Sequence, residues 1–92
     1  SFSAEEAYRL NIVTEIVEDD PLDRAREVAN TIAQQAPLAV QETLASARAA
    51  YTDPDGEHKQ LQHRLGRLMV TQDVARGMEA FMTKKPAVFE GN

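Results

Sequence analysis

The chain has 92 residues, of which 42% are hydrophobic and 27% charged, with 15 acidic against 10 basic side chains and no cysteine. This length fits one domain, and the missing cysteines exclude disulfide frameworks and thiolate metal sites. No apolar run approaches the roughly 20 residues of a membrane span, and the composition fits neither collagen, coiled-coil rods nor wholesale disorder. We therefore expect a single cytoplasmic domain that does not enter a membrane.

The charges are unevenly distributed along the chain. Residues 1–50 carry nine acids and four bases, so the whole net charge of −5 lies in this half. An acidic half repels phosphate backbones, which argues against a general nucleic-acid binder. The basic step Lys84-Lys85 could still meet a single phosphate.

Residues 3–10 predict a short helix. Ser3 can cap its free amides, while Glu6 reaches back in a capping box. Asn11 follows at the position of a left-handed stop residue, a conformation that asparagine tolerates. The β-branched residues 12–17 then predict a strand or an extended segment. A single strand needs a partner, and the first residue is not methionine, so we expect part of the protein to be absent from these residues.

A turn at residues 18–21 leads into a second helix, which Asp20 caps and Pro21 begins. Five residues at a spacing of three or four define one alanine-rich apolar stripe, which a neighbouring helix could approach closely: Leu22, Ala25, Ala29, Ile32 and Ala36. Pro37 ends this helix and begins a third. The inward face of the third helix is predicted from Val40, Leu44, Ala47 and Tyr51.

Residues 52–56 predict a loop and residues 57–70 a fourth helix. Apolar residues share one side of that helix: Leu61, Leu65, Leu68 and Met69. Thr71 or Asp73 could cap a last helix, after which Pro86 forces an extended tail. We therefore expect a mainly α fold of four to five helices, with one short strand-like segment near the N-terminus.

The residues that could carry chemistry are few. His58 and His63 are the only histidines, and a spacing of five does not place two metal ligands on one helix face. We expect two surface or partly buried histidines and no metal site. The adjacent acids at positions 5–6 and 19–20 point apart, so capping and solubility explain them better than a catalytic dyad. The chain has no G-x-S-x-G, phosphate-loop or G-x-G-x-x-G motif, and we predict no catalytic residue in it.

Four segments follow one another in an informative order: SAEEAYRLNIVTEIV at residues 3–17, LDRA at 22–25, APLAV at 36–40 and DVARGMEAFMTKKPAVF at 73–89. The first resembles a short helix and glycine that lead into a G-L-V-N-E-V-V strand in the enoyl-CoA hydratase/isomerase (crotonase) family. The third resembles the family's P-P-L-A-V turn. The last is similar to its closing pattern D-x-x-E-G-x-x-A-F-x-x-K-R-x-P-x-F. The resemblance covers nearly the whole chain.

The resemblance implies that residues 1–92 form the C-terminal helical region of a larger hydratase (lyase) or isomerase in fatty-acid or related acyl-CoA metabolism. In the family this region packs the oligomer, a trimer or hexamer, and covers an active site. The acid/base glutamates and the oxyanion hole come from a catalytic core that is absent here. We therefore expect the chain alone to be inactive, with a coenzyme A thioester as the substrate of the parent enzyme and no further cofactor.

Two residues match family positions that contact the substrate. By position, Phe81 corresponds to a phenylalanine that lines the bound acyl-CoA, and Lys84 to a lysine that meets the phosphate end of CoA. An aromatic face suits a flat or apolar group, and a point charge suits a phosphate. The alternative is that Phe81 is an ordinary core residue and Lys84 a solvated lysine near a helix C-terminus.

Three residues need a separate explanation. Asn11 replaces the usual glycine, and Arg76 stands where the family often has glutamate, which reverses a charge. Gly77 inside a helix costs about 1 kcal/mol relative to alanine, so either a close contact, as across a subunit boundary, or a kink would account for it.

One rival hypothesis belongs to another functional class. The chain could be a free-standing helical interaction module, which pairs with another protein through its alanine and leucine stripes and has no catalytic activity. An upstream catalytic core in the same gene would decide against this alternative.

Overall fold

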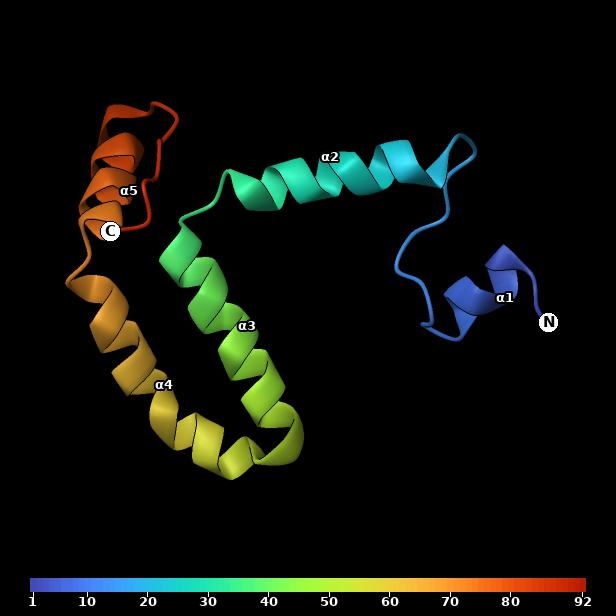
Figure 1. Ribbon diagram of the computed structural model, residues 1–92, viewed down its shortest axis with the longest axis horizontal. Coiled ribbons are helices and arrows are strands. Elements are labelled where there is room, and N and C mark those ends of the chain that lie inside the picture. Colours follow the sequence, from blue (N-terminus) through green and yellow to red (C-terminus); the bar gives the residue numbers. More distant parts are fainter. The chain divides into compact units, whose positions relative to one another are not determined.

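Five helices follow one another along residues 1–92, all of which the computed structural model describes (Figure 1): α1 (Ala4–Arg9), α2 (Pro21–Ala33), α3 (Pro37–Thr52), α4 (Pro54–Met69) and α5 (Gln72–Thr83). The expected mainly α fold is confirmed. The chain contains no strand, so residues 12–17 form only an irregular segment between two helices. The chain divides into two compact units, Ser1–Asn30 and Thr31–Asn92.

In the first unit, the Ser3 cap and the Asn11 stop of α1 are confirmed, but the predicted capping box is wrong. The Ser3 hydroxyl accepts a hydrogen bond from the Glu6 amide at 3.1 Å, while the Glu6 carboxylate pairs with Arg9 instead of completing a capping box. Asn11 adopts the left-handed conformation with φ 61°. This turn brings the amide of Ile12 to within 2.9 Å of the Ala7 carbonyl oxygen. In a strand, the Ile12 amide would be free to pair with a neighbouring strand. Here it bonds to the end of α1 instead.

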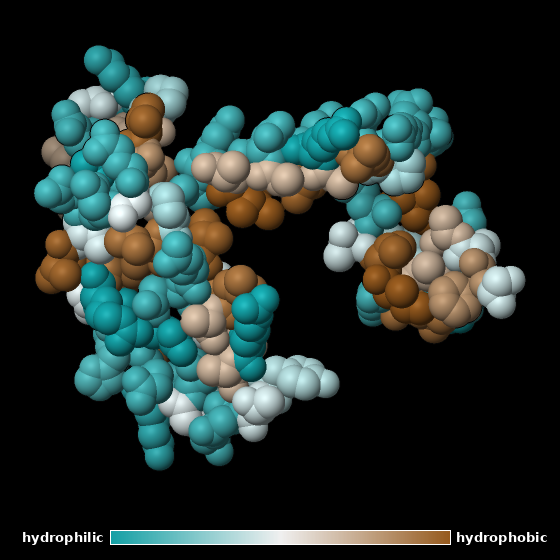
Figure 2. All heavy atoms as spheres, in the orientation of Figure 1, coloured by the Kyte–Doolittle hydropathy of each residue, from teal (hydrophilic) through white to brown (hydrophobic).

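Helix α2 starts at the predicted cap but buries no residue. An oxygen of the Asp20 carboxylate accepts a hydrogen bond from the Leu22 amide at 3.0 Å. Arg24 donates to Glu15 and to Glu27, both on the exposed surface. The large apolar side chains of α2, among them Leu22 and Ile32, remain exposed, and Figure 2 shows hydrophobic residues gathered along one edge of the helix.

The loop predicted at residues 52–56 is wrong, because a single residue separates α3 from α4. The Asp53 amide donates to the Ala49 carbonyl at the end of α3, and the Asp53 carboxylate accepts from the Gly56 amide at the start of α4, at 3.0 Å. Pro54 takes the first position of α4, where its missing N–H costs nothing. Asp53 thus caps both helices, and it is the one residue that connects α3 to α4.

Charged side chains hold α3 and α4 together in the second unit. The Arg64 guanidinium donates to both oxygens of Glu57, at 2.6 and 3.0 Å, and to Glu42 at 3.1 Å. The hydrogen bonds from Arg64 and then from Ser46 lower the pKa of the buried Glu57. The inward face predicted for α3 is wrong at Leu44 and Tyr51, which are 48% and 92% exposed, because α3 turns the side of Glu42 and Ser46 toward α4. Ala47 does line the groove between the two helices.

Only three side chains of the chain are buried, and two of them are charged: Ala7, Glu57 and Asp73. Every large apolar side chain keeps contact with solvent, so polar contacts replace a hydrophobic core as the interior of this chain. No helix is both long enough and apolar enough to cross a membrane.

Candidate functional site

The predicted substrate contacts, Phe81 and Lys84, lie at the C-terminal end of α5. Lys84 adopts the left-handed conformation with φ 55°, and its amide donates to the Phe81 carbonyl at 3.4 Å. The next amide, of Lys85, donates to the Ala80 carbonyl at 3.0 Å. This pair of bonds is a Schellman motif, which fixes the main chain of Lys84 to the turn that carries Phe81.

Both predicted side chains are open to solvent. Phe81 is 85% exposed, so it belongs to no core formed by this chain. Lys84 and its neighbour Lys85 are exposed, and neither forms an ion pair with the chain. The C-terminal end of α5 therefore carries an exposed aromatic ring and two exposed cations. No acidic side chain of the chain is paired with either cation, so none competes with a ligand for them.

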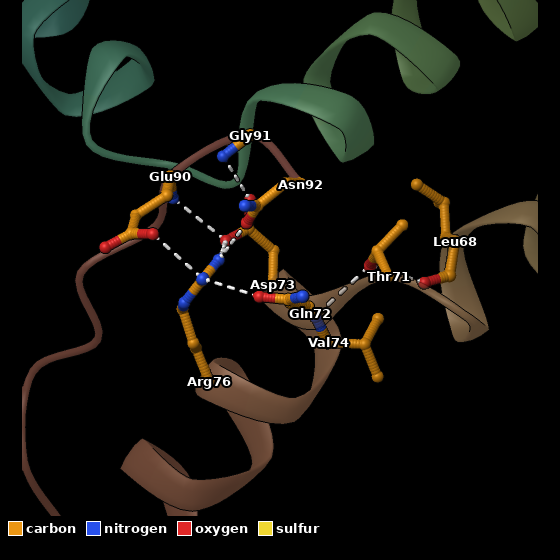
Figure 3. A network of polar contacts seen from close by, with 9 residues as sticks. All are labelled: Leu68, Thr71, Gln72, Asp73, Val74, Arg76, Glu90, Gly91 and Asn92. Carbon is orange, nitrogen blue, oxygen red and sulfur yellow. Dashed lines mark hydrogen bonds and ion pairs between the residues drawn. The ribbon is translucent and has the colours of Figure 1, made fainter.

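A second polar cluster, which the sequence did not predict, ties the tail back to the start of α5 (Figure 3). We call it the C-terminal clasp, formed by Asp73, Arg76, Glu90, Gly91 and Asn92. The amides of Glu90 and Gly91 donate to the two Asp73 carboxylate oxygens at 2.9 and 2.8 Å, and the Asp73 amide donates to the Asn92 carbonyl at 2.8 Å. Thr71, and not Asp73, is the N-cap of α5, since its hydroxyl accepts from the Val74 amide at 3.3 Å.

Arg76 joins the two halves of the clasp. Its guanidinium donates to Asp73 at 2.6 Å, to Glu90 at 2.9 Å and to Gln72 at 3.1 Å. The positive charge that departs from the family pattern therefore lies between two carboxylates of its own chain. Burial raises the pKa of Asp73, but the hydrogen bonds from the Glu90 amide, Arg76 and the Gly91 amide outweigh it and leave the pKa below its usual value.

The chain also has two hollows lined mainly by apolar side chains. A groove of about 460 Å³ lies between α3 and α4, where Ala47, Ala50, Leu61 and Leu65 line it. A smaller hollow of about 260 Å³ lies where the start of α3, the end of α4 and the start of α5 meet, beside Phe89. His58 and His63 are exposed on α4, and no three histidine or acidic side chains gather as a set of metal ligands.

Known proteins resemble this chain over its whole length. The sequence model of the enoyl-CoA hydratase/isomerase family matches residues 1–92. A curated relative, the (E)-benzylidenesuccinyl-CoA hydratase of Thauera aromatica, is 40% identical across 97% of this chain and 36% of its own length. The enoyl-CoA hydratase EchA19 of Mycobacterium tuberculosis is 30% identical across 96% of this chain and 34% of its own length.

Solved structures agree with these sequence matches. A "probable enoyl-CoA hydratase/isomerase" from Mycobacterium abscessus superposes with a TM-score of 0.93 at 41% identity, covering 99% of this chain and 36% of that one. An enoyl-CoA hydratase/isomerase from Mycobacterium paratuberculosis gives a TM-score of 0.84 at 32% identity, covering 98% of this chain and 36% of that one. The chain thus spans about a third of the length of its relatives. It belongs to the enoyl-CoA hydratase/isomerase family.

Proposed function

We propose that residues 1–92 form the C-terminal helical region of an enzyme that hydrates an enoyl-CoA thioester in fatty-acid or related acyl-CoA metabolism. Family membership supports an acyl-CoA substrate, and the hydratase names of both curated relatives favour hydration over isomerisation. In this proposal the region completes the CoA pocket and packs a homo-oligomer, a trimer or hexamer.

The C-terminal end of α5 supports the proposal that this region completes the CoA pocket. Phe81 presents an exposed ring, and three residues later Lys84 presents an exposed cation on a main chain that the Schellman motif holds in place. A ring can cover the flat or apolar parts of an acyl-CoA, and an ammonium group can meet a phosphate as a point charge. Both groups are ready for a ligand without breaking an internal contact.

The packing proposal is supported by the apolar side chains that the chain leaves uncovered. Leu22, Val28 and Ile32 of α2 are exposed, as are Leu61 and Leu65 in the groove beside α3. Monomeric proteins rarely expose continuous apolar patches larger than a few hundred Å². We propose that the catalytic part of the enzyme and neighbouring subunits cover these faces.

In this proposal, the residues that catalyse the reaction lie in the rest of the enzyme. Stabilising the enolate of a thioester needs aligned hydrogen-bond donors at the carbonyl oxygen, and such an oxyanion hole is usually the largest catalytic contribution. We expect purified residues 1–92 to hydrate crotonyl-CoA no faster than buffer, measured by the loss of enoyl absorbance. Turnover that co-purifies with the chain through several independent separation steps would refute this part of the proposal.

The substrate contact is tested in the enzyme that contains residues 1–92. Lys84→Ala should raise KM for crotonyl-CoA by about tenfold and change kcat by less than about twofold, because a remote phosphate contact contributes equally to ground-state and transition-state binding. Lys59→Ala removes a comparable exposed cation from α4 and serves as the control. If Lys84→Ala leaves KM at the value of the control, Lys84 does not bind the substrate.

A further inference from the structure

The direction of α5 is not fixed by helix packing. Val70 and Thr71 alone join it to α4, and α3 with α4 is the one helix pair in extensive contact. A link of two residues can act as a hinge, and only the local bonds of Thr71 hold this one: its hydroxyl donates to the Leu68 carbonyl at 2.6 Å and accepts from the Val74 amide at 3.3 Å. A second attachment is needed to hold α5 at one angle.

The C-terminal strap, residues 84–92, supplies that attachment. It leaves the far end of α5 at Lys84 and returns to the near end, where the clasp binds it. Asp73, the acceptor of two strap amides, is 3% exposed and is the most buried residue of the chain. Arg76 adds an ion pair to Glu90, so charge and backbone hydrogen bonds both hold the strap.

The strap also reaches the start of α3. A Cβ atom placed on Gly91 would lie 3.5 Å from Cγ of Pro37, the first residue of that helix. Asp73 and Phe89 line the same hollow as Leu38 and Ala39 of α3. The clasp therefore lies at the junction of three helices, beside the hinge, as the close view of Figure 3 shows for Gly91 and α3.

We infer that Asp73 and Arg76 are positioning residues, which lock the hinge of α5 through the strap and thereby hold Phe81 and Lys84 in place for the acyl-CoA. This inference rests on the proposed function, because it concerns the same site. Neither residue touches the substrate in this account.

The length of α5 explains why such a lock matters. Twelve residues at a rise of 1.5 Å make α5 about 18 Å long, so a tilt of about 10° at the hinge moves its far end by about 3 Å. Displacements of about 1 Å already impair positioned contacts. A lock at the near end is therefore needed if the far end is to meet a phosphate accurately.

Amide exchange and steady-state kinetics test the inference together, in the enzyme that contains residues 1–92. Asp73→Asn sets an amide donor against a strap amide, and Arg76→Ala removes the ion pairs; both should speed exchange of the Glu90 and Gly91 amides by about tenfold or more. Both should also raise KM for crotonyl-CoA by about tenfold, with kcat changed by less than about twofold. Arg76→Lys keeps the charge but not the planar fork, and should give intermediate values.

Two further variants separate this inference from the proposed function. Arg24→Ala, which removes an exposed arginine of α2 that binds the carboxylates of Glu15 and Glu27, should change neither exchange of the Glu90 and Gly91 amides nor KM. Lys84→Ala should raise KM without changing exchange of the Glu90 and Gly91 amides. If Lys84→Ala raises KM but the clasp variants do not, or if they leave exchange unchanged, the positioning role is wrong. If Lys84→Ala itself has no effect on KM, the proposed substrate contact of Lys84 fails, whether or not exchange in the clasp variants changes.

Discussion

The ring of Phe89 lies over Gly77. A Cβ atom placed on Gly77 would be 3.5 Å from Cε1 and 3.7 Å from Cζ of that ring. The strap residue Phe89, brought back by the clasp, therefore packs against the one glycine of α5. The sequence leaves a close helix contact or a kink open as explanations for Gly77. The neighbour found within the chain is this ring, at a distance that also admits a methyl group, so the contact does not require glycine.

This contact predicts the effect of adding one methyl group. A separation of 3.5 Å is ordinary van der Waals contact, so Gly77→Ala should fit without moving Phe89. Alanine also removes the entropic cost of glycine in a helix, and we expect the free energy of unfolding of the chain to rise by about 0.5–1 kcal/mol. Urea unfolding monitored by circular dichroism measures it. If Gly77→Ala instead lowers the free energy of unfolding, the contact between position 77 and Phe89 is too tight to admit a methyl group.

Two substitutions of Lys84 should differ in their effect on stability but not in their effect on substrate binding. A residue other than glycine in the left-handed conformation is strained by roughly 1–2 kcal/mol. Lys84→Gly should therefore stabilise the chain by about 1 kcal/mol, while Lys84→Ala keeps the strain and gains nothing. In the enzyme that contains the chain, both variants should raise KM to the same extent, because both lose the cation.

The opposite pattern would be informative. If Lys84→Gly left KM unchanged while Lys84→Ala raised it, the effect on KM would follow the strained backbone and not the charge. Thermal unfolding of the two variants, measured beside their kinetics, gives this comparison directly.

The lowered pKa of Asp73 predicts an acid-sensitive clasp. The unfolded chain titrates near the ordinary aspartate pKa of about 3.9, above the folded value, so the carboxylate stabilises the fold at neutral pH and this contribution is lost as the pH falls below about 4. The stability difference between the wild type and Asp73→Asn should therefore narrow on acidification. Urea unfolding at pH values from 7 to 3 measures it, and other carboxylates cancel in the difference. A gap that stays constant would show that Asp73 does not titrate with the clasp.

Local signals in the sequence predict where most of the helices begin. Proline and capping residues mark the first turns of α2 at Asp20 and of α3 at Pro37, and Thr71 caps α5. Asn11 also takes the left-handed conformation expected of it. These features succeed because each depends on a few neighbouring residues, whose backbone preferences are intrinsic.

Features that depend on distant residues were missed. Apolar spacing placed Tyr51 inside, but the pairing of Arg64 with Glu42 and Glu57 selects another face of α3. The clasp joins residues 14 to 19 positions apart, and opposite charges at Arg76 and Glu90 do not by themselves specify such a pairing. For the site, the resemblance supplied Phe81 and Lys84, since no local pattern distinguishes them from other exposed residues.

The contact between Lys84 and the phosphate end of CoA is tested most directly by changing both partners. In the enzyme that contains residues 1–92, KM is measured for crotonyl-CoA and for its analogue without the 3′-phosphate, with the wild type and with Lys84→Ala. The account predicts that Lys84→Ala raises KM for the intact ester by about tenfold and for the dephosphorylated ester by less than about twofold. A KM for the intact ester that is the same in the wild type and in Lys84→Ala would contradict it.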